Sequence, residues 1–124
     1  MSAPSGQIDP PVCRKDLVVA AASDSESFPS AFDWINGRQA ILATSVCNIP
    51  APEIREYARD WILGGGEIRC VPETDRPERR HFHYNITIDG VPGFSRGLYV
   101  KLELFCTDEK TPTVNMLNAH EPTF

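Results

Sequence analysis

The stretch His81-Phe-His-Tyr-Asn-Ile-Thr-Ile88 decides the fold, because polar and apolar residues alternate along its whole length. An alternation with a period of two is typical of a β-strand that buries one face and exposes the other. Every second side chain, from Phe82 to Ile88, therefore points to an apolar face. The other four side chains belong to a polar face.

The segment Leu98–Phe105 repeats this alternation, and two shorter segments, Glu67–Val71 and Thr113–Ala119, have strand character on either side of the pair. Consecutive strands joined by short loops usually pair antiparallel. The sequence therefore predicts an antiparallel meander of about four strands that ends before Pro122, because proline cannot donate to the ladder.

A single amphipathic helix is predicted over Pro52–Leu63. Its apolar residues recur at the three- and four-residue spacing of one helical face, and they are Ile54, Tyr57, Ala58, Trp61 and Ile62. Gly64-Gly65-Gly66 follows and is typical of a helix C-cap. The expected fold class is α+β, with a small antiparallel β-meander sheet of about four strands packed on one amphipathic helix.

The N-terminal part is expected to be irregular and partly helical. Residues 1–29, rich in proline and serine, are interpreted as a flexible N-terminal arm, and residues 30–124 as a single α+β domain. Leu17–Ala22 fits either a short helix or an edge strand. Ser30 and Asp33 resemble a helix start, which predicts one or two helical turns over Ala31–Asn36 ended by Gly37. Arg38–Val46 remains undecided.

The composition indicates an ordinary soluble globular protein. The 124 residues carry a formal net charge of −5, and no apolar run is long enough to span a bilayer. The first residues lack the basic and apolar regions of a secretory signal, so we expect a cytoplasmic protein that does not enter a membrane. The negative charge argues against broad, non-specific binding of nucleic acid.

Four cysteines, Cys13, Cys47, Cys70 and Cys106, lie at wide intervals without a Cys-x-x-Cys pair. This spacing indicates neither a zinc ribbon nor a thioredoxin-type site. We expect reduced thiols that act as small apolar residues.

The polar face of the predicted sheet is the candidate active site. It gathers His81 and His83 from one strand and Tyr99, Lys101 and Glu103 from the next. A histidine that exchanges protons near neutral pH, beside a fixed cation, is what metal-free cleavage of RNA through the 2′-hydroxyl requires. The alternative is that these are only the solvated residues of a one-sided sheet.

Further basic residues flank this face: Arg79, Arg80 and Arg96. They are candidate substrate-binding residues, together with His120. In a regular last strand His120 would share the core-facing side of Val114 and Met116, whereas a bulge near Asn118 would reverse it.

A zinc site is an alternative, because His81 and His83 project the same way and can ligate one ion. Two ligands are too few, and Glu103 or His120 would have to complete the site. We therefore expect no metal and no cofactor.

The helix ending in Gly-Gly-Gly-Glu-Ile, the strand Gly97-Leu-Tyr-Val-Lys-Leu-Glu-Leu104 and the closing strand from Thr113 to Glu121 resemble the RelE/MqsR-like ribonuclease toxins of bacteria, in the BECR superfamily. The similarity is chiefly to the MqsR-like branch, in which a strand of the form "Tyr, apolar, Lys, apolar" precedes the last strand. It covers about residues 49–121.

The resemblance implies a metal-independent endoribonuclease of a toxin–antitoxin or contact-delivered toxin system, with RNA as substrate and a cognate antitoxin or immunity protein as partner. Tyr99 and Lys101 match the strand motif. We predict His83 as general acid or base, Lys101 and Arg96 as phosphate-binding residues, and Tyr99 and His81 as assisting residues. The alternatives are a non-enzymatic acidic interaction module, such as an immunity protein or antitoxin-like inhibitor, and a structural domain without an active site.

Overall fold

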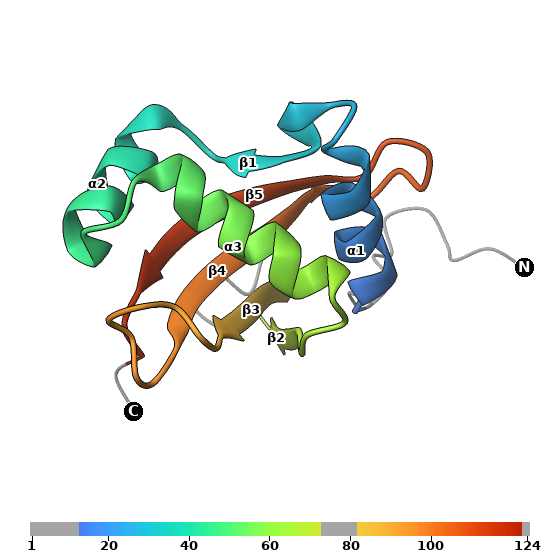
Figure 1. Ribbon diagram of the computed structural model, residues 1–124. Helices are drawn as coiled ribbons and strands as arrows, with labels where there is room; N and C mark the ends of the chain where they lie inside the picture. The colour runs from blue at the N-terminus through green and yellow to red at the C-terminus, as the bar shows by residue number, and fades with distance from the viewer. Residues whose placement is uncertain (1–12, 73–81, 123–124) are drawn as a thin grey trace, which may run out of the picture.

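The computed structural model describes residues 13–72 and 82–122, which form three helices, a short 3-10 turn and five strands. In chain order they are α1 (Lys15–Asp24), η1 (Pro29–Ala31), β1 (Phe32–Trp34), α2 (Gly37–Cys47), α3 (Ala51–Leu63), β2 (Arg69–Pro72), β3 (Phe82–Ile88), β4 (Leu98–Cys106) and β5 (Thr113–His120). The strands make one sheet in the order β1-β5-β4-β3-β2 (Figure 1). The fold is therefore α+β with a mixed sheet.

All three helices cover the same face of the sheet. Figure 1 shows α3 crossing in front of the strands, with α1 at one end of it and α2 at the other. Val18 of α1, Ala43 of α2 and Ile54 of α3 belong to one buried cluster with alternate side chains of β3, β4 and β5. The opposite side, which we call the open face, carries the remaining side chains of these strands.

The helix and the meander follow the sequence patterns closely. The predicted helix Pro52–Leu63 corresponds to α3, and the four predicted strands correspond to β2 through β5, which pair antiparallel. The observed sheet has a fifth strand, β1, which pairs parallel with β5. The expectation of a purely antiparallel sheet of about four strands is thus correct for the meander and incomplete at one edge.

The prediction of a helix over Ala31–Asn36 was wrong. Phe32–Trp34 extends along β5, with Phe32 opposite Val114, and the Phe32 side chain is fully buried. Gly37 begins α2 instead of ending a helix, because the Asn36 side chain accepts a hydrogen bond from the backbone N–H of Gln39 at 2.9 Å and so caps the new helix.

The expectation of a flexible arm over residues 1–29 was wrong for its second half. Lys15–Asp24 is helix α1, and Leu17, Val18, Ala21 and Ala22 are buried in the core. Burial of these four side chains holds the segment against the sheet, which also settles the choice between helix and strand for Leu17–Ala22. Residues 1–12 lie outside the described part of the chain.

The glycine triplet ends α3 as the sequence predicts. The N–H of Gly66 donates to the carbonyl of Trp61 at 2.8 Å, and the N–H of Gly65 donates to that of Ile62 at 3.2 Å. Gly65 has a φ of 85°, a conformation that residues with a Cβ rarely adopt. These two bonds form a Schellman cap, which turns the chain from α3 into β2.

The expectation of four reduced thiols was wrong for one pair. Cys13, just before α1, and Cys70, in β2, form a disulfide with their Cα atoms 6.1 Å apart. Cys47 and Cys106 are free. The two bonded residues are 57 positions apart, so only the folded chain brings them together.

Among the described residues, no helix has the length and apolar character needed to cross a membrane.

Candidate active site on the open face

The open face is a lattice of polar side chains set by the strand register. Three rows cross the strands, and each row joins residues that are direct cross-strand partners. The first row is Arg69, Asn85, Lys101 and Asn118, the second is Val71, His83, Glu103 and Asn115, and the third is Thr87, Tyr99 and His120. Their sequence neighbours Tyr84, Ile86, Val100 and Leu102 are buried beneath the helices.

A one-residue bulge in β5 turns His120 to the open face. Leu102 pairs with Met116 and Lys101 pairs with Asn118, so Leu117 is an extra residue in the ladder. The extra residue shifts the alternation by one position after Met116. Ala119 consequently occupies the buried position opposite Val100, and His120 lies opposite Tyr99.

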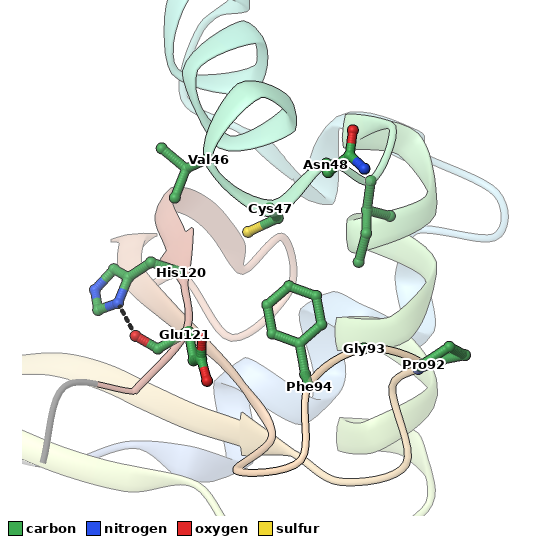
Figure 2. Close-up of a pocket in the computed structure, with 9 residues that line it drawn as sticks. Val46, Cys47, Asn48, Pro92, Gly93, Phe94, His120 and Glu121 are labelled. Atoms are coloured by element: carbon green, nitrogen blue, oxygen red, sulfur yellow. Dashed lines mark hydrogen bonds between the residues drawn. The ribbon is translucent and has the colours of Figure 1, made fainter.

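The His120 ring is held in place from two sides. Its centroid lies 4.7 Å from that of the Tyr99 ring, with 30° between the ring planes. Its Nδ1 lies 2.7 Å from the backbone carbonyl oxygen of Glu121, as the dashed line in Figure 2 marks. A carbonyl oxygen only accepts, so Nδ1 carries the hydrogen and the neutral ring has its lone pair on Nε2. That arrangement suits Nε2 to proton transfer.

The Tyr99 hydroxyl is a proton donor in this setting. Burial raises its pKa above the usual value of 10.0, while the positive charge of Arg69 and a hydrogen bond with Asn85 act in the opposite direction. A raised pKa keeps the hydroxyl protonated throughout the neutral range. Tyr99 can therefore donate a hydrogen bond or a proton to an oxygen of a bound anion.

Lys101 lies between the amide side chains of its two cross-strand partners. The Oδ1 atoms of Asn85 and Asn118, its partners on β3 and β5, are buried and have no hydrogen-bond partner among the described residues. Buried acceptors are usually satisfied in folded proteins. Both acceptors are therefore available to a donor on a bound molecule.

The basic side chains of the open face differ in their ion pairing from the arginines beside the helices. Arg14, Arg55 and Arg59 each form ion pairs with carboxylates. Neither Arg69 nor Lys101 forms an ion pair with a carboxylate in the described part of the chain. The open face can thus attract an anion locally, although the protein as a whole is acidic.

Arg69 is a further basic residue of the open face that the sequence analysis did not name. It lies on β2 directly opposite Asn85, in the row of Lys101. The alternation of its neighbours could have indicated this position. Ile68 is buried and Cys70 packs against the core, so the residue between them lies on the open face.

Four of the predicted site residues, His83, Tyr99, Lys101 and His120, share the open face. His83 lies opposite Glu103 on β4, and His120 lies opposite Tyr99, four residues along the same strand. With about 4.8 Å between strands and about 3.4 Å per residue, the Cα atoms of His83 and His120 are roughly 16 Å apart. The two histidines are too far apart to act on one phosphate.

Lys101 lies between them, two residues and one strand from each, which corresponds to roughly 8 Å between Cα atoms. Arg96 is exposed in the loop that joins β3 to β4. Arg79, Arg80 and His81, which were also predicted as site residues, lie outside the described residues.

A cavity of about 720 Å³ lies at the edge of this site, and His120 and Glu121 form part of its lining. It is bounded by the last turn of α2, the loop after β3 and the end of β5, and Figure 2 shows the Phe94 ring pointing into it while the His120 ring points away. Cys47 in its wall is a poor nucleophile, because burial raises the pKa of its thiol and its Sγ lies 3.4 Å from the carbonyl oxygen of Ala119.

No group of three or more metal-ligating side chains is found among the described residues. His81, on which the zinc alternative depends, lies outside the described residues.

No protein-family model matches the chain, and neither a curated protein nor a solved structure matches it.

Proposed function

We propose that the protein is a metal-independent endoribonuclease that cleaves RNA on the open face of its sheet. The observation that carries the proposal is the position of His120, whose ring lies against Tyr99 with its lone pair on Nε2. Lys101 lies in the next row of the same face. A base, a proton donor and a cation are the groups that 2′-hydroxyl chemistry requires.

The reaction uses these three side chains in named roles. Nε2 of His120 takes the proton of the 2′-hydroxyl, and the 2′-oxygen forms a bond to phosphorus. The bond from phosphorus to the 5′-oxygen breaks, and the leaving oxygen keeps the electron pair and takes a proton from Tyr99. The imidazolium of His120 returns its proton to Tyr99, and Lys101 offsets the charge that develops on the phosphoryl oxygens. The products are a 2′,3′-cyclic phosphate and a 5′-hydroxyl.

This assignment revises the predicted roles, because it gives the proton transfer to His120 instead of His83. His83 lies roughly 16 Å from His120, beyond the reach of the same phosphate. It stays a candidate substrate-binding residue, because its Cα atom lies roughly 8 Å from that of Lys101 on the same face. The resemblance to RelE/MqsR-like toxins agrees with the proposal, since Tyr99 and Lys101 are the residues that match their strand motif. A cytoplasmic site of action would follow from an RNA substrate.

Cleavage of total RNA in the presence of EDTA tests the proposal. The variants His120→Ala and Lys101→Met are compared with Lys110→Met, which removes an exposed lysine from the turn before β5. Loss of a general acid or base lowers a rate by about 10²–10⁴-fold. We expect that loss for His120→Ala, a comparable loss for Lys101→Met and none for Lys110→Met. Equal cleavage by all four proteins would point to a contaminating nuclease and refute the site.

A second candidate function, a non-enzymatic inhibitor such as an immunity protein or antitoxin, is favoured by the exposed side of α2. Ile41, Leu42 and Val46 on this helix are 72%, 54% and 58% exposed. Adjacent exposed aliphatic side chains are typical of protein–protein contacts, and the net charge of −5 suits a basic partner.

Expression in growing cells separates the two candidates. An active ribonuclease arrests growth, and His120→Ala relieves the arrest. An inhibitor leaves growth unchanged and binds a basic toxin through α2, so Ile41→Asp weakens that complex while Lys101→Met does not.

A further inference from the structure

We propose that Arg69 binds a second phosphate of the substrate, next to the phosphate that is cleaved, and that the Cys13–Cys70 disulfide positions it. The inference rests on the proposed ribonuclease function. It begins with the row of Arg69, Asn85, Lys101 and Asn118, which crosses β2, β3, β4 and β5 on the open face.

The geometry of this row fits a single strand of RNA that crosses the β-strands. Arg69 and Lys101 are two strands apart in one row, which places their Cα atoms roughly 10 Å from each other. Both side chains are long, and proteins that bind single-stranded RNA commonly follow its backbone with a line of cations. With one phosphate at Lys101 and His120, the neighbouring phosphate toward β2 falls within reach of Arg69.

Arg69 is also available for an anion. It forms no ion pair with a described carboxylate, unlike Arg14, Arg55 and Arg59 beside the helices. Its guanidinium presents paired N–H groups that match two phosphate oxygens. Its positive charge acts to lower the pKa of the Tyr99 hydroxyl, against the larger effect of burial, which agrees with their common place on the open face.

The strand that carries Arg69 is short and lies at the edge of the sheet. β2 has four residues and pairs only with β3. Short edge strands open more readily than central ones. Cys70, the next residue, is joined to Cys13, and Cys70 lies opposite Tyr84, whose hydroxyl accepts a hydrogen bond from the N–H of Arg14 at 2.8 Å. The disulfide therefore fastens β2 to the start of α1.

This attachment makes the second phosphate contact sensitive to reduction. A dithiol reductant supplies two electrons and two protons, the S–S bond breaks, and two thiols form while the reductant becomes a disulfide. Disulfides that occur in the cytoplasm are usually redox-sensing. Reduction removes the covalent link of β2 to Cys13, so the position of Arg69 becomes less fixed. Lys101, Tyr99 and His120 lie on the central strands, and their positions do not change.

The test compares two substrates that each contain a single ribonucleotide, so that only one bond can be cleaved. The first is a dinucleotide with one phosphodiester, and the second is the same pair flanked by two deoxynucleotides on each side. All four bases are represented at the ribonucleotide position. The variant Arg69→Gln is compared with Arg38→Gln, which removes an exposed arginine from α2.

For Arg69→Gln we expect KM for the longer substrate to rise about tenfold, the effect of one lost charged hydrogen-bonding contact. KM for the dinucleotide and kcat for both substrates stay unchanged, and Arg38→Gln changes none of them. The binding of a fully deoxy hexanucleotide gives a second readout. For Arg69→Gln, the slope of log Kd against log salt concentration should decrease by about 0.7, the value of one phosphate contact on a single strand.

Treatment with dithiothreitol, or the variant Cys13→Ser, should produce the same rise in KM for the longer substrate only. Amide hydrogen exchange should speed up in β2 and stay unchanged in β4. If Arg69→Gln lowers kcat on the dinucleotide, or leaves both the salt slope and KM unchanged, the second phosphate contact is refuted. If reduction speeds exchange in β2 without changing KM, the positioning role is refuted. Absence of cleavage by the wild type refutes the ribonuclease itself, a separate outcome.

Discussion

The rings of Tyr99 and His120 lie in contact, with their centroids 4.7 Å apart, because a single extra residue in β5 places His120 opposite Tyr99. In a regular strand His120 would have pointed into the core beside Met116. The contact joins a hydroxyl that stays protonated to an imidazole with its lone pair on Nε2. The clearest predictions concern this pair.

The neutral form of His120 should carry its hydrogen on Nδ1. In short peptides the Nε2–H tautomer predominates, and the bond of Nδ1 to the carbonyl of Glu121 reverses this preference. A two-dimensional ¹⁵N–¹H spectrum of the neutral ring measures the tautomer directly. A ring protonated on Nε2 would contradict the proton-transfer role.

Deletion of Leu117 should be tolerated. Removing the extra residue makes β5 regular and keeps the pairs Lys101–Asn118 and Tyr99–His120. Deletion of Ala119 is the control, because it moves His120 to the buried position opposite Val100, where a polar ring without a partner is costly. Contacts between the Tyr99 and His120 rings in an NMR spectrum should survive the first deletion and disappear in the second. Survival in both would show that β5 can slip.

Gly66→Ala should destabilise the fold. A Cβ on Gly66 overlaps the Trp61 indole, which is held in place because its Nε1 donates to the carbonyl of Glu67 at 2.9 Å. Overpacking of this kind costs about 1–3 kcal/mol in the free energy of unfolding. Gly37→Ala is the matched control, since a Cβ there meets nothing within 4 Å in the first turn of α2. Urea unfolding should show a loss for the first variant and no loss, or a gain of about 0.5–1 kcal/mol, for the second.

The four cysteines should differ in their reaction with iodoacetamide. Burial raises the pKa of the Cys47 thiol, so its reactive thiolate is scarce in the folded protein at neutral pH and increases only as the pH rises toward that elevated pKa. Cys106 is partly exposed and should be alkylated first. Cys13 and Cys70 should react only after reduction. Peptide mass spectrometry at several pH values measures the order, and early labelling of Cys47 would show that the end of α2 opens readily.

The sequence predicted those elements whose own residues repeat with a clear period. The alternation in β3 and β4 and the helical spacing in α3 are local, so each could be recognised without knowledge of its partner. The polar face of the candidate site followed from the same alternation, and it correctly placed His83, Tyr99 and Lys101 on one side of the sheet.

The remaining features depend on distant contacts. β1 has only three residues, and its partner β5 lies about 80 positions further along the chain, so no local period marks it. α2 was undecided because its larger aliphatic side chains, Ile41, Leu42 and Val46, face solvent while Ala43 and Cys47 face the core. The position of His120 depended on a one-residue bulge, and a single residue reverses which face every later side chain occupies.

The two outer strands of the sheet are its shortest, with three residues in β1 and four in β2, whereas the three inner strands have seven to nine. Unpaired backbone groups on a long outer strand invite pairing with another molecule and lead to aggregation. Here β1 covers the edge of β5, and β2 covers that of β3 and ends in Pro72, which has no N–H to offer. The brief edge strands thus limit association of the sheet edge-to-edge with another molecule, while the broad polar face stays open beside them.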